Sequence, residues 1–125
     1  MKKKTALIFS LCLFSLFSFS QVYKFKSTET DIEKPGKNAQ TKYEVNYHTF
    51  DFNKKQVIFE GTNSKGEKTK IVYPMKSFYK DGVTNVIVVN QFSVKEIWFS
   101  VAVNNLGYDL TDGTRLACYN ITRLN

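Results

Sequence analysis

The chain has 125 residues, a formal net charge of +7 and 15% aromatic residues. A chain of this length suits one domain with a single hydrophobic core. No repeat, low-complexity tract or interdomain linker is visible in it, which excludes repeat and multidomain architectures.

Residues 1–20 have the pattern of a cleavable secretory signal peptide. Three lysines at 2–4 precede an uncharged apolar run at 6–19, which is too short to span a bilayer. Ser18 and Ser20 satisfy the small-x-small rule, so we expect cleavage after Ser20. Acylation at Cys12 and a retained N-terminal anchor are the alternatives. The chain is therefore predicted to be exported to the periplasm, the outer surface or the medium, with no membrane span after cleavage.

The predicted mature domain, residues 21–125, differs in composition from the precursor. Loss of three lysines and no acid lowers the net charge from +7 to +4, and Cys118 is the only cysteine left. An intrachain disulfide is thereby excluded, and stability has to come from packing of seven phenylalanines, seven tyrosines and Trp98.

The first part of this domain alternates with a period of two. Residues 22–26 predict a strand with one exposed face. Residues 29–42 are polar and contain proline and glycine, so we expect a loop. Residues 43–47 predict a second strand. The apolar positions then move from odd to even numbers, which predicts a bulge or bend near His48 and Thr49.

Hairpins are predicted in the middle of the chain. Polar tips at 53–56 and 61–68 separate strand-like segments, and the second tip leads into a strand at 69–73. Residues 74–82 have a proline at the start and a glycine at the end, which favours a helix of no more than one turn.

The strongest strand signals come later. Residues 83–90 and 94–103 are rich in β-branched and aromatic side chains and are separated by a short polar break. Residues 104–114 are dense in Asn, Asp and Gly and predict a long turn. Residues 115–124 predict the last strand.

These segments predict an all-β domain of about seven to eight strands. No segment between the strands has the pattern and length of an amphipathic helix, so the sheet should be antiparallel. A small barrel and a two-sheet sandwich both satisfy the pattern.

His48 and Cys118 are the only histidine and cysteine of residues 21–125. A thiol dyad would have to use this pair, but no local motif surrounds Cys118, and a buried structural cysteine is the favoured interpretation. A closed zinc site would need two carboxylate ligands in addition to His48 and Cys118, so no metal and no cofactor are predicted.

Two groups of carboxylates allow a calcium hypothesis. Glu29, Asp31 and Glu33 would point the same way on an extended chain. Asp109 and Asp112 lie in the predicted 104–114 turn. Solvated loops and turn geometry are the favoured interpretations, since the spacing of an EF-hand is absent.

Nucleic-acid binding is disfavoured. Lysines and aromatic residues alternate at 22–26, as in barrels that stack bases. The predicted export, the modest charge of +4 and the position of most lysines at hairpin tips all argue against it.

The function predicted from these observations is a non-enzymatic binding module, with a protein, a glycan or a small ligand as partner. Abundant tyrosine without a convergent catalytic set favours recognition over turnover. The candidate contact residues are Tyr43 and Tyr47 on a strand and Tyr108 and Asp109 on the long turn.

Two other functions remain open. A carrier would hold an apolar ligand in a barrel cavity lined by Phe59, Val88 and Phe99. A hydrolase would use some of the scattered carboxylates, namely Asp51, Asp81, Asp109 and Asp112.

Overall fold

The structure is a computed structural model, and it describes residues 21–63 and 65–125. The predicted signal peptide, residues 1–20, lies outside the described residues. Within the described part of the chain, no helix is long and apolar enough to cross a membrane.

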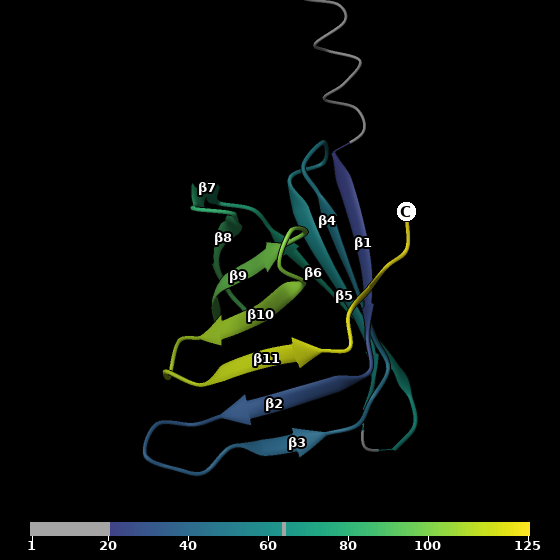
Figure 1. The fold of residues 1–125 in the computed structure, drawn as a ribbon, viewed down its shortest axis with the longest axis vertical. Helices are drawn as coiled ribbons and strands as arrows, with labels where there is room; N and C mark the ends of the chain where they lie inside the picture. The colour runs from purple at the N-terminus through teal and green to yellow at the C-terminus, as the bar shows by residue number, and fades with distance from the viewer. Residues whose placement is uncertain (1–20, 64) are drawn as a thin grey trace, which may run out of the picture.

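The described residues form twelve strands and no helix (Figure 1). Their bounds are β1 Val22–Ser27, β2 Glu29–Glu33, β3 Gln40–Lys42, β4 Asn46–Asp51, β5 Gln56–Thr62, β6 Lys68–Pro74, β7 Ser77–Asp81, β8 Thr84–Gln91, β9 Val94–Ser100, β10 Asn105–Leu110, β11 Arg115–Tyr119 and β12 Thr122–Arg123.

The strands form two antiparallel sheets that pack face to face. The five-stranded sheet has the order β12-β1-β4-β5-β6, and the seven-stranded sheet has the order β3-β2-β11-β10-β9-β8-β7. The sheets do not close into a barrel. Of the two predicted architectures, the all-β class and the two-sheet sandwich are confirmed.

The chain crosses repeatedly from one sheet to the other. It leaves the five-stranded sheet at Thr28, returns through residues 43–45, leaves again near Met75 and returns near Asn120. In Figure 1 the strands of the seven-stranded sheet run across those of the five-stranded sheet. Each sheet is therefore assembled from segments far apart in sequence.

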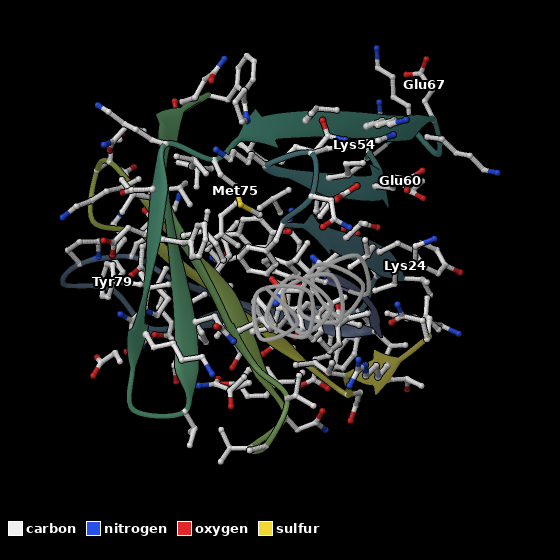
Figure 2. The ribbon with its side chains drawn as sticks, turned by 90° about the horizontal axis from the view of Figure 1, so that it is seen from above. Lys24, Lys54, Glu60, Glu67, Met75 and Tyr79 are labelled. Atoms are coloured by element: carbon white, nitrogen blue, oxygen red, sulfur yellow. The ribbon has the colours of Figure 1, made fainter. Side chains whose placement is uncertain are left out.

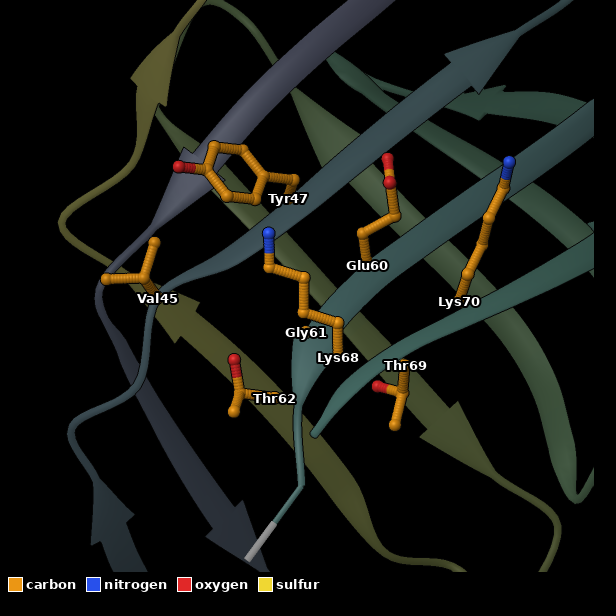
Figure 3. A pocket seen from close by; sticks show the side chains of 8 residues that line it. All are labelled: Val45, Tyr47, Glu60, Gly61, Thr62, Lys68, Thr69 and Lys70. Atoms are coloured by element: carbon orange, nitrogen blue, oxygen red, sulfur yellow. The ribbon is translucent and has the colours of Figure 1, made fainter. Parts of the chain in front are cut away.

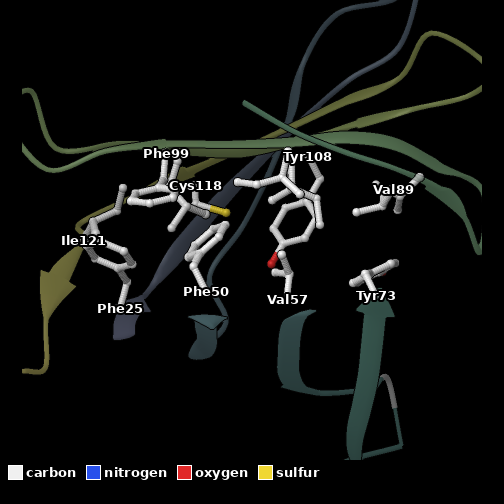
Figure 4. Packing of buried hydrophobic residues seen from close by; sticks show 13 residues of the cluster. Phe25, Phe50, Val57, Tyr73, Val89, Phe99, Tyr108, Cys118 and Ile121 are labelled. Atoms are coloured by element: carbon white, nitrogen blue, oxygen red, sulfur yellow. The ribbon is translucent and has the colours of Figure 1, made fainter. Parts of the chain in front are cut away.

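Aromatic rings fill the space between the sheets (Figure 4). Phe25 and Phe50 rise from the five-stranded sheet and meet Phe99 from the other sheet, with the Phe50 and Phe99 ring centroids 4.2 Å apart. All three side chains are buried. Each buried side chain of this size contributes roughly 1.5–3 kcal/mol to stability, so ring packing can stabilise this small domain.

Three segments differ from the prediction and add β2, β3, β7 and β10, and the predicted last strand, 115–124, is divided into β11 and β12. Residues 29–42 form the β2–β3 hairpin, 77–81 form β7 in place of a helical turn, and 104–114 contain β10. In each case neighbouring strands supply hydrogen-bond partners that local composition does not show. The Asn, Asp and Gly content misled the prediction for 104–114.

The bulge or bend predicted near His48 and Thr49 is also absent. β4 pairs with β1 in one register, from Val22 opposite Asp51 to Ser27 opposite Asn46. The change from odd to even positions arises because residues 43–45 cross between the sheets. The hairpin tips predicted at 53–56 and 61–68 are confirmed.

Candidate functional site: the acidic face of the seven-stranded sheet

Alternation along the strands decides which side chains the seven-stranded sheet turns outward. On β2, Thr30 and Ile32 line a cavity between the sheets, so the side chains at 29, 31 and 33 lie on the outer face. On β9, Ile97 and Phe99 are buried in the core, which leaves Glu96 and Trp98 on the same outer face.

This outer face is acidic. It carries six carboxylates and one guanidinium, and we call these residues, together with the three aromatic residues between them, the acidic face. The carboxylates are Glu29, Asp31, Glu33, Asp81, Glu96 and Asp109; the guanidinium is Arg115; the aromatic residues are Tyr79, Trp98 and Tyr119. Like charges gathered on one face create a local negative potential although the chain is basic overall.

Trp98 lies at the middle of the face, over the backbone of Gly107. The two residues are opposite each other in the β9–β10 ladder, and a Cβ at Gly107 would run into the indole ring. Glycine is therefore required for the ring to lie on the sheet. Trp98 is partly buried, and its ring nitrogen has no hydrogen-bond partner among the described residues.

Arg115 joins the ring to the carboxylates. Its Nε lies 2.8 Å from Asp109 Oδ1, and a second nitrogen lies 3.4 Å from the other carboxylate oxygen. The guanidinium carbon is 5.6 Å from the centre of the Trp98 ring. The hydrogen bond to Asp109 raises the pKa of Arg115, which keeps the cation charged.

The carboxylates of the face contribute to raised pKa values of its two tyrosines. The Tyr79 hydroxyl lies 3.4 Å from a carboxylate oxygen of Glu96. Desolvation, followed by the charge of Glu96, raises the pKa of Tyr79. Desolvation and then the three carboxylates of β2 raise the pKa of Tyr119. Both phenols stay neutral donors at physiological pH.

Two adjoining depressions cross the face and share Asp109 and Arg115. One, of about 280 Å³, also has Tyr79, Glu96 and Trp98 in its walls. The other, of about 430 Å³, continues toward the β2–β3 and β10–β11 loops, where Lys34 and Lys95 stand at its edge. Together they form a shallow polar groove rather than an enclosed pocket.

The opposite face of the molecule differs in charge. Outward positions of the five-stranded sheet include Lys24, Lys26, Lys68 and Lys70 around the single acid Glu60 of the β5–β6 ladder. Figure 2 shows Lys24 and Glu60 on one side of the molecule and Tyr79 on the other. A depression of about 240 Å³ on the basic side is lined by Tyr47, Glu60, Lys68 and Lys70 (Figure 3).

The four predicted contact residues do not come together. Tyr43 is 78% exposed in the crossing segment, and Tyr47 is 42% exposed on the five-stranded sheet. Asp109 belongs to the acidic face. Tyr108 is only 3% exposed, because it lies in β10 with its side chain in the core and not on a loop.

Tyr108 takes part in a buried hydrogen-bonded chain. Its hydroxyl lies 2.7 Å from His48 Nδ1, and His48 Nε2 lies 2.9 Å from the Ser27 hydroxyl. All three side chains are buried. Desolvation lowers the pKa of His48 to about 3, so the ring is neutral at physiological pH. His48 and Ser27 are fully buried and Tyr108 is 3% exposed, so this chain is part of the packing between the sheets.

The other predicted candidates are also dispersed. Among the described residues, no group of three or more His, Cys, Asp or Glu side chains is arranged to hold a metal ion. Asp51 and Asp112 accept backbone hydrogen bonds in turns. Phe99 is in the core, Phe59 lines the cavity between the sheets, and the alternation of β8 turns Val88 outward.

Sequence reasoning missed Trp98, Glu96 and Arg115 as members of one site. A signal existed for two of them: in residues 94–100, Glu96 and Trp98 alternate with the buried Ile97 and Phe99. Arg115 could not be placed beside them, since its strand follows a turn in sequence and joins the sheet only in the fold.

No family model, no curated protein and no solved structure matches the chain. The chemistry of the acidic face is therefore the basis for a function.

Proposed function

We propose that the protein is an exported, non-enzymatic recognition module that binds a cationic polypeptide segment on its acidic face. The observation that carries the proposal is the set of six carboxylates around Trp98 on one sheet face. Export rests on the signal-peptide pattern of residues 1–20.

Complementary charge supports this choice of partner. An array of carboxylates attracts Lys- and Arg-bearing segments and speeds their encounter. The shallow groove across Trp98 and Asp109 is open along its length, which suits an extended chain better than a compact ligand. A nucleic acid would be repelled by the same carboxylates.

Arg115 illustrates how a partner side chain would bind. Its guanidinium is held between the Trp98 ring and the Asp109 carboxylate of the same chain. Tyr79 beside Glu96 and Tyr119 beside the carboxylates of β2 repeat this pairing of a ring with an acid. An arriving arginine can make the same two contacts at either place.

The test is a titration of the protein with short oligoarginine and oligoglutamate peptides. Trp98 is the only tryptophan of the chain, so its fluorescence reports directly on the acidic face. We expect saturable binding of oligoarginine that weakens by about tenfold or more between roughly 20 and 300 mM NaCl, since salt screens exposed charges. Oligoglutamate should not bind.

Charge reversal on the two faces provides the matched control. Glu33→Lys, at the groove of the acidic face, should weaken oligoarginine binding by about fivefold. Glu60→Lys on the opposite face makes the same change of charge and should leave binding within about twofold. Equal losses in the two variants, or equal binding of both peptides, would contradict the proposal.

A further inference from the structure

A cavity of about 160 Å³ lies between the two sheets, away from the acidic face. It opens where β2 and the segment after β3 face β4 and β5. Its inner wall is apolar and includes Ile32, Phe59 and Leu116 together with the buried thiol of Cys118. A cavity of about 150 Å³ with apolar walls is large enough to hold a benzene-sized ring.

Two buried polar oxygens at this cavity have no strong hydrogen-bond partner. Asn46 is 5% exposed, and its side-chain oxygen makes no hydrogen bond with the described residues. The hydroxyl of Thr30 is also buried, and its neighbour is the Cys118 thiol, a weak hydrogen-bonding group. Buried polar atoms are nearly always paired in folded proteins, so the Asn46 oxygen at this cavity indicates a missing partner.

Close packing holds the Asn46 side chain in place. A Cβ at Gly61 would lie 2.5 Å from the Asn46 oxygen and 2.9 Å from the Phe59 ring. Glycine at this position is therefore what leaves room for both side chains in the cavity wall. The unpaired oxygen is a fixed part of the wall rather than a mobile surface group.

The groups that line the inner wall carry no charge at physiological pH. Burial raises the pKa of the Cys118 thiol to about 11 and that of the Tyr108 hydroxyl well above its ordinary value. The charged side chains of the lining are the exposed Lys42 and the half-buried Glu44. A charged ligand would lose its hydration inside without gaining an opposite charge.

We propose that this cavity binds a small neutral molecule that has one apolar ring and a hydroxyl group. The ligand hydroxyl would donate to the Asn46 oxygen and accept from the Thr30 hydroxyl, while its ring packs on Phe59 and Leu116. This site is independent of the recognition function proposed for the acidic face, because its side chains lie on the inner side of the sheet.

The experiment titrates the purified full-length protein with phenol and with toluene, which has the same ring and no donor, and follows binding by protein NMR. We expect saturable shifts at Thr30, Asn46 and Phe59 with phenol, and an affinity about tenfold higher than for toluene. Asn46→Leu should remove this preference, and Asn105→Leu, on the outer face of β10, should preserve it.

Thr30→Val is a second, nearly isosteric variant that applies even where Asn46→Leu does not fold. It should reduce the preference for phenol by at least about threefold. Absence of saturable phenol binding, equal affinity for phenol and toluene, or an unchanged preference in a folded Asn46→Leu or Thr30→Val variant would each overturn the proposal.

Discussion

His48 shows how burial determines the chemistry of a single residue. Both ring nitrogens are hydrogen-bonded inside the core, to Ser27 and Tyr108, and desolvation lowers its pKa to about 3 from the ordinary value of 6.5. The same side chain in an exposed loop would be a candidate general base. Here it is a neutral part of the packing between the sheets.

Stability should therefore depend on pH through His48. The unfolded chain binds a proton near pH 6.5 and the folded chain only near 3, so the stabilisation is complete above 6.5 and is lost as the pH falls toward 3. Between about pH 7.5 and 5.5 the free energy of unfolding should fall by about 1.4 kcal/mol. Urea unfolding at the two pH values measures this difference.

His48→Phe should remove most of this pH dependence. Tyr108→Phe keeps the titrating ring, so it should lower stability by about 1 kcal/mol at both pH values and preserve the slope. An equal slope in wild type and His48→Phe would show that another group is responsible.

Gly107 is the second residue whose role is defined by one contact. Gly107→Ala should cost about 1–3 kcal/mol, because the new methyl group meets the Trp98 ring and the Leu116 carbonyl oxygen, 2.8 Å away. The displaced ring should also change the tryptophan emission spectrum. Gly36→Ala is the control: it has a positive φ of 72° but open space around it, so it should leave the emission unchanged.

At the scale of elements, neighbouring strands decide whether a polar segment becomes a strand. The side chains of β7 are all exposed, yet the strand pairs with β8 over its full length, from Ser77 opposite Val88 to Asp81 opposite Thr84. The turn that starts this pairing has Gly82 at a φ of 63°. A local signal of proline and glycine at 74–82 suits a hairpin as well as a helical turn, and β8 selects the hairpin.

The β4–β5 hairpin gives a test at this scale. Lys55 has a φ of 53°, a left-handed conformation that is unfavourable for a residue with a Cβ. Lys55→Gly should therefore raise the free energy of unfolding by about 0.5–1 kcal/mol. Lys54→Gly, at a position without a positive φ, should lower it by a similar amount. If thermal or urea unfolding showed Lys54→Gly to be more stable than Lys55→Gly, this interpretation of the turn would be contradicted.

At the scale of the whole molecule, the sandwich separates the charges. A net charge of +4 for residues 21–125 suggests a mildly basic protein, but the two sheet faces differ in sign. Sheet alternation sends the acids of β2, β9 and β10 to one outer surface and the lysines of β1 and β6 to the other. Binding should therefore be governed by the local face rather than by net charge.

The fold also shields its one described thiol. Cys118 is buried on β11, an inner strand between β2 and β10, and burial raises its pKa to about 11. Its reaction with a thiol reagent at about pH 8 should follow global unfolding, and destabilising variants should speed it in proportion. Added reductant should not change the unfolding midpoint. Rapid labelling of the native protein would show that the reagent reaches the thiol through the cavity between the sheets or that β11 opens locally.

A large part of the fold was predictable from sequence. The period of two, the aromatic core and the hairpin tips at 53–56 and 61–68 gave an all-β antiparallel domain, since these are local properties. Strands with polar faces, such as β2 and β7, were missed because their pairing partners lie elsewhere in the chain. The odd-to-even change near His48 predicts a bulge or bend, but a crossing between sheets at residues 43–45 produces the same pattern.

The candidate site depended much more on the tertiary structure. From the sequence, Glu29, Asp31 and Glu33 share a direction only if the chain is extended there, and the favoured prediction for 29–42 is a loop. Asp109 is predicted to lie in a turn. Only the order β2-β11-β10-β9 placed these acids on one surface with Trp98 and Arg115, and only the second sheet decided that Tyr108 faces inward. Alternation is a property of each strand, whereas strand order and the choice of the buried face arise from long-range packing.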